Sequence, residues 1–479
     1  MLLLDALVLS GLLALVYYQY RRSGILISPG VAALLMNVIL GVYFAYPFAL
    51  TYQSLETIHQ LHNYEGLSIA ADKLLGIVML GTFSALLAYR YTPLLFPRLA
   101  TKVARRPLQP HSNLSELTLG ACISALLGVA SVWTFFYAVN QIPFLSFDPA
   151  YTRSSLGYGS SFRAFQWVGT YVSTTGCSFL LAGLATRRLV HYKMLSFATV
   201  IATLVTNLLT ASRTPFIIPI LVGGLVYSTI GKKKLTLVRA FMWTLGLFLV
   251  VTLIQAHRFR TGVSLENMWD EVISGNTNSP FRDNAWLLMN FEDKQFDFYH
   301  GKTVIGGYIP SRFLPFKGDY SWGAVSLDLV HWTDRYSWLG IGHVYFGDWY
   351  FNFGYPGVIF VGVLMGLVFR LFDLRFFRLL GEYKRLGKPD FCSMFRVWFF
   401  WHIACFAFAN GTSMFVAPRL IGYFIMIMVA AVLRKVSQIG RKASGLQDAV
   451  PFTGLPLTVS PGSWSGIGGK RTALRGGKL

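Results

Sequence analysis

Basic residues at the ends of apolar segments are the part of this sequence best suited to chemistry. The stretch "TNLLTASRTPFIIPI" places Arg213 directly after one apolar run, and "QAHRFRTG" places Arg258 and Arg260 directly after another. The stretch "IPSRFLPFKGDY" adds Arg312 and Lys317. An arginine stays charged at any accessible pH and binds a phosphate group through two parallel hydrogen bonds. Because a charge beside hydrocarbon is costly unless it reaches water or an anion, these residues predict a site for a phosphate or pyrophosphate group.

A different role is open for each of these cations taken singly. Its side chain could extend along the apolar surface to lipid phosphates, or pair with an acid in a loop. His257 and Arg419 also lie beside apolar segments. Basic residues therefore recur at the ends of these segments, beyond the five cations named above. For the set as a whole, we favour anion binding.

A second group of residues could accept a proton during transfer to a hydroxyl group, a step that needs a base within hydrogen-bonding reach. Asp348 is the leading candidate. It lies in "GHVYFGDWYFNFGYPG", immediately before an apolar segment, where an unpaired carboxylate is poorly placed. His331 and His343 are the substitutes. The other acids of this region fit a solvated charge or a helix cap.

Metal and nucleotide chemistry have little support in the sequence. His59 and His62 in "HQLH" have a ligand-like spacing, but no third ligand lies near them. No phosphate-binding glycine loop or nucleotide fingerprint occurs on the segments that we place in the cytoplasm. We therefore expect neither a metal nor a cofactor.

The elements that position these residues follow from the composition. The chain is 54% apolar and 13% charged, with a mean hydropathy of +0.50, whereas soluble domains carry about twice that charged fraction. Apolar runs long enough to cross about 30 Å of hydrocarbon recur along it, and backbone groups in lipid must be paired within each segment. The sequence therefore predicts an all-α, polytopic membrane bundle of about eleven transmembrane helices, near 2–18, 30–50, 69–89, 117–139, 165–185, 194–211, 215–230, 240–256, 354–371, 391–409 and 419–433.

The distribution of basic residues predicts the orientation of these spans. Of the 42 Lys and Arg residues, 28 fall in six segments that we place in the cytoplasm: 19–29, 90–116, 186–193, 231–239, 370–390 and 434–479. The N-terminus then lies on the opposite side and the C-terminus in the cytoplasm. Because this topology accounts for the net charge of +21, we expect no nucleic-acid partner.

Four regions follow from this organisation. Residues 1–256 hold eight spans, 257–353 form one large outer loop, 354–433 hold three spans, and 434–479 form a flexible basic tail. The loop is too aromatic to be disordered, so we expect it to fold and to determine specificity. Within it, "AWLLMNFEDKQF" (285–296) has roughly helical apolar spacing and predicts a short amphipathic helix on the membrane surface.

Three motifs resemble those of the Wzy-type oligosaccharide repeat-unit polymerases. In that family one span ends in Ser-Arg, matched here by Ser212–Arg213. The family's Ile-Pro-Arg element followed by Pro-x-Lys-Pro is matched by Ile309–Pro310, Arg312 and Pro315-Phe-Lys317, with Ser311 inserted and Gly318 in place of the last proline. Its acid-x-Tyr-x-Asn-Phe-Gly-x-x-Gly run is matched from Asp348 to Gly357, with aspartate where glutamate is common. These motifs cover about residues 200 to 370, and elsewhere the likeness rests on hydropathy and span number.

The resemblance implies a bacterial inner-membrane glycosyltransferase of the GT-C type with its active site on the periplasmic face. It would transfer a glycan chain from one undecaprenyl pyrophosphate to the terminal sugar hydroxyl of another lipid-linked repeat unit, building O-antigen, capsule or exopolysaccharide. Its partners would be that lipid-linked oligosaccharide, membrane lipids, a chain-length regulator and a flippase. Under this interpretation the pyrophosphate is bound without metal by Arg213, Arg258, Arg260, Arg312 and Lys317. The base is Asp348, or else His331 or His343, and Trp322 and Tyr350 stack on sugar rings.

Two other functions stay open. An O-antigen ligase would transfer the same donor onto lipid A core and would share the architecture and the basic outer face, although the run from Asp348 to Gly357 matches the polymerase type. A lipid-linked oligosaccharide flippase or other transporter belongs to another class. Such proteins tend to show repeat symmetry and matched broken helices, and the sequence has neither an internal repeat nor a symmetric arrangement of loops.

Overall fold

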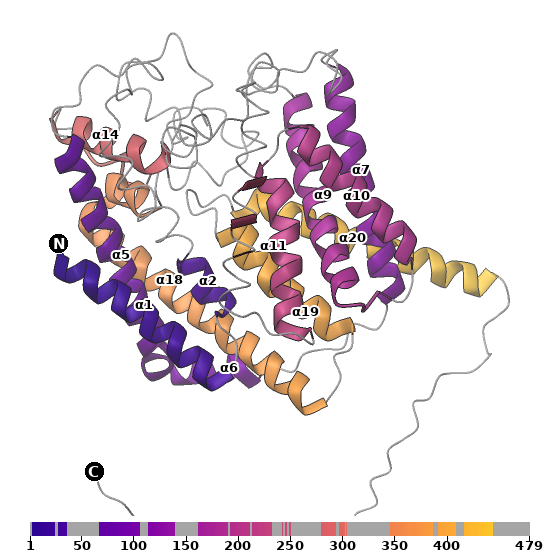
Figure 1. Cartoon of the computed structure of the whole chain (residues 1–479), viewed down its shortest axis with the longest axis horizontal. Helices are drawn as coiled ribbons and strands as arrows, with labels where there is room; N and C mark the ends of the chain where they lie inside the picture. Colours follow the sequence, from indigo (N-terminus) through magenta and orange to yellow (C-terminus); the bar gives the residue numbers. More distant parts are fainter. Residues whose placement is uncertain are drawn as a thin grey trace, which may run out of the picture. The chain divides into compact units, whose positions relative to one another are not determined.

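The structure is a computed structural model of the whole chain (Figure 1). It divides into two compact units, Met1–Arg434 and Lys435–Leu479. The residues that the structure describes are 2–23, 27–35, 67–105, 114–138, 161–189, 192–210, 213–231, 242, 245–246, 249–250, 279–293, 297–301, 303, 345–386, 391–408 and 416–443.

Almost all of the described residues are helical. The helices are α1 (Leu2–Ser23), α2 (Pro29–Leu35), α5 (Leu67–Leu95), α6 (Pro97–Arg105), α7 (Leu114–Ala138), α9 (Ser161–Ala185), α10 (Lys193–Leu209), α11 (Arg213–Ile230), α14 (Ser279–Asp293), α18 (Tyr345–Leu386), α19 (Phe391–His402), the π-helix η2 (Ile403–Phe408) and α20 (Val416–Ala443). Five stretches within the described ranges are long and apolar enough to cross a membrane: Leu67–Leu95, Ser115–Tyr137, Val168–Ala185, Tyr345–Tyr383 and Leu420–Ile439. The predicted helical membrane architecture is thus confirmed in kind, while the count of eleven spans and the large outer loop stay predictions.

One hydrophobic core joins α1, α2, α5, α14 and the first part of α18. The two longest helices of this group, α5 and α18, lie side by side in Figure 1 and pack along their glycines. A side chain at Gly362 would overlap the carbonyl oxygen of Gly81, and one at Gly366 would overlap that of Ala85. Small residues let membrane helices approach to backbone contact where no hydrophobic effect drives them together.

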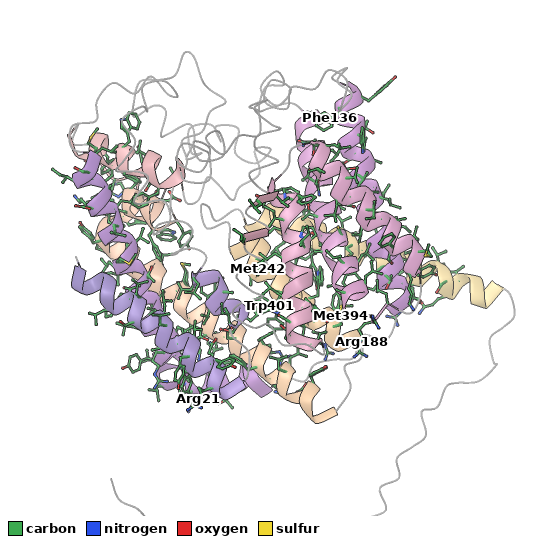
Figure 2. The ribbon with its side chains drawn as sticks, viewed as in Figure 1. Arg21, Phe136, Arg188, Met242, Met394 and Trp401 are labelled. Carbon is green, nitrogen blue, oxygen red and sulfur yellow. The ribbon has the colours of Figure 1, made fainter. Side chains whose placement is uncertain are left out.

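A second core joins α7, α9, α10, α11 and α19 with the later part of α18. Its helices also meet at small residues, because Gly128 of α7 faces the carbonyl oxygen of Gly169 in α9. Figure 2 labels two of its side chains, Met394 and Trp401, both of which are buried. The indole of Trp401 donates a hydrogen bond of 2.9 Å to Oγ1 of Thr229, which ties α19 to α11.

Many serines and threonines lie buried within these apolar helices. Their hydroxyl groups mostly donate to a carbonyl oxygen three or four residues earlier, as Thr82 does to Val78 at 2.7 Å and Thr203 does to Thr199 at 2.9 Å. The hydroxyl hydrogen is thereby satisfied within its own helix. These positions therefore need no water, and they do not by themselves indicate a polar channel.

The helix α18 is folded back on itself at Gly354. This residue has φ 63° and ψ −157°, a conformation that is nearly restricted to glycine. Phe346 lies eight residues before Gly354 and Gly362 eight residues after it, yet both contact Gly81 of α5. The ring of Trp349 likewise lies 6.2 Å from that of Phe360. Segments 345–353 and 355–386 therefore run back alongside each other as a helical hairpin.

The predicted surface helix at 285–296 proves to be a buried one. Residues 294–296 of it lie outside the described part of the chain, and residues 285–293 belong to α14, which begins earlier, at Ser279. Its six consecutive side chains from Asn284 to Met289 are all buried against the first core. Exposure of one face was expected from the roughly helical apolar spacing, but α14 packs against α5 and also contacts Gly347 and Phe351 of α18.

Candidate functional site

Asp348 lies on segment 345–353, the first arm of the hairpin, and is 5% exposed. Its Oδ1 atom accepts a hydrogen bond of 2.8 Å from the hydroxyl of Thr303 and one of 3.1 Å from Nδ2 of Asn352. Asn352 is one helical turn further along, so both side chains share a face of the arm. These are the hydrogen bonds that the carboxylate accepts within the described part of the chain, and both are accepted by Oδ1. Oδ2 is therefore the atom that could receive a proton from a bound hydroxyl group.

Residues 299–301 are hydrogen-bonded to the end of this arm. The helical arm ends at Gly354, whose non-helical φ and ψ leave the carbonyls of Phe351 and Asn352 without the partners that a continued helix would supply. The backbone N–H of His300 donates to the carbonyl of Asn352 at 3.1 Å, and the N–H of Tyr299 donates to the carbonyl of Phe351 at 3.0 Å. The N–H of Gly301 donates to Oδ1 of Asn352 at 2.9 Å. These bonds place Thr303 next to Asp348, although the two residues are distant in sequence.

Tyr350 lies on the opposite side of the same arm and is 6% exposed. Its ring contacts those of Phe298 and Tyr355, with centroids 6.1 and 5.1 Å away. The ammonium group of Lys73, from α5, lies 5.9 Å from the ring centroid, within the range of a cation–π contact. The ring is thus packed among protein groups, and its stacking on a sugar stays a prediction.

A buried amide borders this arm from α14. Asn284 is 0% exposed, and neither its Oδ1 nor its Nδ2 has a hydrogen-bond partner among the residues that the structure describes. A buried polar group without a partner costs about 1–3 kcal/mol. A side chain at Gly347 would overlap Oδ1 of Asn284, so glycine is needed there for the amide to fit.

Arg213 is the first residue of α11, and the first turn of this helix is joined to α10 at a carbonyl that a proline leaves without a helical partner. Pro219 lacks the N–H group that would bond the carbonyl of Pro215, four residues earlier. The side chain of Asn207, on α10, donates to that carbonyl instead, at 3.1 Å. Asn207 is 2% exposed, so this bond is shielded from water. This hydrogen bond joins the last turn of α10 to the first turn of α11, where Arg213 lies.

A second buried carboxylate, Asp373, lies on the other arm of the hairpin. Its Oδ2 accepts hydrogen bonds from Ser28 at 2.5 Å and Tyr89 at 2.6 Å, and its Oδ1 accepts one of 2.8 Å from the N–H of Gly30. The hydroxyl of Tyr89 in turn accepts a bond of 2.8 Å from Gln19. Asp373 therefore joins α1, α2, α5 and α18 through groups that all come from the protein.

The second core also holds a buried histidine, His402, immediately before the π-helix η2. Its Nδ1 lies 3.1 Å from the hydroxyl of Ser178, which also accepts a bond of 3.0 Å from the indole of Trp398. The rings of Trp398 and His402 are stacked with centroids 5.0 Å apart. A π-helical turn often marks a functional position, but here the neighbouring groups are protein side chains that tie α19 to α9.

The structure brings together only part of the predicted site. Asp348 and Tyr350 are placed as described above, and Arg213 is placed by its backbone at the start of α11. The other candidates lie outside the described residues: the histidines His331 and His343, the cations Arg258, Arg260, Arg312 and Lys317, and Trp322. Their roles stay predictions, as does the metal-independent reaction.

Three residues of the site were not identified from the sequence. Thr303 and Asn284 lie far from the motif in the sequence, and they meet Asp348 and Gly347 only through the fold. Lys73 lies within a predicted span, where it follows Asp72 and the other neighbours are apolar or small. An ionisable residue inside such a span is by default a candidate for function, so this cation could have been singled out.

Comparison of the chain with protein-family models, with curated proteins and with solved structures finds no match.

Proposed function

We propose that this chain is a membrane glycosyltransferase that polymerises oligosaccharide repeat units carried on undecaprenyl pyrophosphate. The growing glycan is transferred from its lipid carrier to the terminal sugar hydroxyl of an incoming unit, on the periplasmic face of a bacterial inner membrane. The observation that carries the proposal is the buried carboxylate of Asp348, held through one oxygen by Thr303 and Asn352. The motif resemblance at Ser212–Arg213 and from Asp348 to Gly357 adds to it.

The chemistry requires a base that is fixed beside the acceptor hydroxyl. The hydroxyl oxygen attacks the anomeric carbon of the donor, its proton passes to Oδ2 of Asp348, and the bond from that carbon to the pyrophosphate breaks. The electron pair of that bond leaves with the pyrophosphate. Two hydrogen bonds to Oδ1 orient the carboxylate before the substrate arrives, which is the kind of preorganisation that favours proton transfer.

The leaving group needs positive charge where the glycosidic bond breaks. Arginines at a water-poor interface stabilise such charge more strongly than they would in bulk water. Arg213 stands at the head of α11, and the bond from Asn207 to Pro215 clamps that end of the helix. We assign Arg213 to the pyrophosphate together with Arg258, Arg260, Arg312 and Lys317.

The test is the substitution Asp348→Asn in the native host, with the surface polysaccharide displayed on a gel. Asparagine keeps the shape and an oxygen that can accept from Thr303 and Asn352, but it cannot take up the proton. We expect the ladder to collapse to single repeat units while the amount of protein in the membrane is unchanged. The matched control is Asp297→Asn, which replaces an exposed carboxylate two residues before Tyr299. This variant should leave the ladder intact.

Two other results would replace the proposal. If long chains persist on the lipid carrier but never reach lipid A core, the protein is a ligase. If repeat units accumulate on the cytoplasmic side of the membrane, it is a flippase. The flippase is the second candidate because Asp373 and His402 are ionisable residues buried within apolar helices, a common feature of transport pathways.

A further inference from the structure

We infer that Asn284 is a substrate-binding residue that holds a hydroxyl group of the acceptor sugar beside the carboxylate of Asp348. The inference rests on the proposed glycosyltransferase function and adds a specificity-determining residue to it. Three observations carry it: the unpaired amide, the glycine on which the amide lies, and the carboxylate next to that glycine.

The first observation is the chemical state of the amide. A carboxamide has two donor hydrogens and an oxygen with two acceptor positions. In Asn284 both the oxygen and the nitrogen are buried, and neither has a partner within the described part of the chain. A leucine of similar size would fill the same space without leaving polar atoms unpaired. The amide is therefore suited to a polar group that comes from a ligand.

The second observation is where the amide lies. A Cβ atom at Gly347 would overlap Oδ1 of Asn284 and would come within 2.9 Å of its Cγ and 3.3 Å of its Nδ2. The amide thus rests directly on the backbone of the hairpin arm. Gly347 immediately precedes Asp348, and successive residues of a helix are about 100° apart around its axis. The arm accordingly has the amide on one side and the carboxylate on the adjoining side.

The third observation concerns which ligand this pair would accept. A carboxylate only accepts hydrogen bonds, whereas an amide both donates and accepts. A sugar ring with two neighbouring hydroxyl groups matches both, since one hydroxyl can give its proton to Asp348 while the next exchanges hydrogen bonds with Asn284. A phosphate group is a poor match because it would be repelled by the carboxylate. Asn284 therefore belongs with the acceptor sugar and not with the pyrophosphate of the donor.

The test compares Asn284→Leu with the wild type and with Asp348→Asn, each as purified full-length protein. The substrate is the lipid-linked repeat unit extracted from a strain of the native host that lacks this chain. We expect Asn284→Leu to raise KM about 3-fold to 10-fold with a smaller effect on kcat. Asp348→Asn should instead abolish turnover. The unfolding temperature of Asn284→Leu should be no lower than that of the wild type, because no hydrogen bond among the described residues is lost.

The outcomes separate the inference from the function on which it rests. Loss of turnover in Asp348→Asn with an unchanged KM in Asn284→Leu overturns the inference and leaves the function standing. Full turnover in both variants overturns the proposed function. A lower unfolding temperature in Asn284→Leu with unchanged kinetics shows that the amide is a structural part of the fold. Should leucine prevent folding, Asn284→Ala gives the same comparison, since it removes the amide and adds no bulk.

Discussion

Thr303 donates its hydroxyl hydrogen to Oδ1 of Asp348 over 2.8 Å, across 45 positions of sequence. Asn352 donates to the same hydroxyl oxygen of Thr303 at 2.5 Å, so each of the three side chains is hydrogen-bonded to the other two. All three are at least nine-tenths buried. The orientation of the carboxylate therefore depends on a residue that is distant in the sequence, and this dependence can be measured.

Replacing Thr303 by valine should weaken both the fold and the reaction. Valine has nearly the same shape but cannot donate, so Asp348 loses one of its two bonds and the free energy of unfolding falls by about 1–3 kcal/mol. We expect the carboxylate to turn away from its productive position and kcat to fall about tenfold. The measurement is turnover of the lipid-linked repeat unit together with a thermal unfolding curve.

Thr303→Ser is the matched control because it keeps the hydroxyl group and removes only a methyl group. It should retain most of the turnover. Equal losses in the serine and valine variants would show that Thr303 acts through packing and not through its hydrogen bond.

Gly354→Ala should prevent the hairpin from closing. Glycine has φ 63° and ψ −157° here, and a residue with a side chain is strained in this region by about 1–3 kcal/mol. We expect a lower amount of folded protein in the membrane and loss of polysaccharide polymer. Gly381→Ala, in the same helix, provides the control, because a Cβ atom there meets nothing within 4 Å. That variant should be neutral or more stable, since alanine favours a helix over glycine by about 1 kcal/mol. A fully active Gly354→Ala would show that the fold in α18 is not needed.

The bond from Asn207 to Pro215 predicts a specific coupling with Pro219. Asn207→Leu alone should destabilise the protein by about 1–3 kcal/mol, because the carbonyl of Pro215 is left unpaired. Pro219→Ala restores the N–H group that reaches this carbonyl, so Asn207→Leu should cost less in that background. A double-mutant cycle on unfolding free energies measures the difference. Additive effects would show that the carbonyl has another partner.

The network at Asp373 should be needed for stability but not for the reaction. Tyr89→Phe removes the bond to Asp373 and the acceptor of Gln19, and should lower the free energy of unfolding by about 1–3 kcal/mol. We expect KM and kcat of the remaining folded protein to be unchanged. A change in kcat would place Asp373 in the functional pathway and favour the transporter candidate.

The helices and their apolar spacing follow from the sequence because each depends on neighbouring residues. The spans predicted near 69–89 and 165–185 lie within α5 and α9, and residues 117–138 of the span predicted near 117–139 lie within α7. The fold in α18 was also encoded locally, since Gly354 and Pro356 interrupt a helical pattern. It was missed because the aromatic run before Gly354 was assigned to the loop, and hydropathy does not distinguish a straight helix from a hairpin.

The site was predictable only where its residues share a motif. Asp348 and Asn352 are one turn apart and belong to the same run. Thr303 and Asn284 reach this run through long-range packing, and their spacing in the sequence carries no information about it. The burial of α14 was likewise hidden, because the partner that covers its second face comes from elsewhere in the chain.

The hairpin also bears on how the protein enters the membrane. A straight helix of 42 residues would be about 63 Å long, roughly twice the thickness of the hydrocarbon layer. Segment 355–386 is long enough to be inserted as an ordinary span during synthesis, whereas segment 345–353 is too short to be recognised as one. We therefore expect this shorter arm to dock after its neighbour is in place, together with Thr303 and α14. The carboxylate of Asp348 would thus reach its hydrogen-bond partners at a late step of maturation, after the surrounding helices have been inserted.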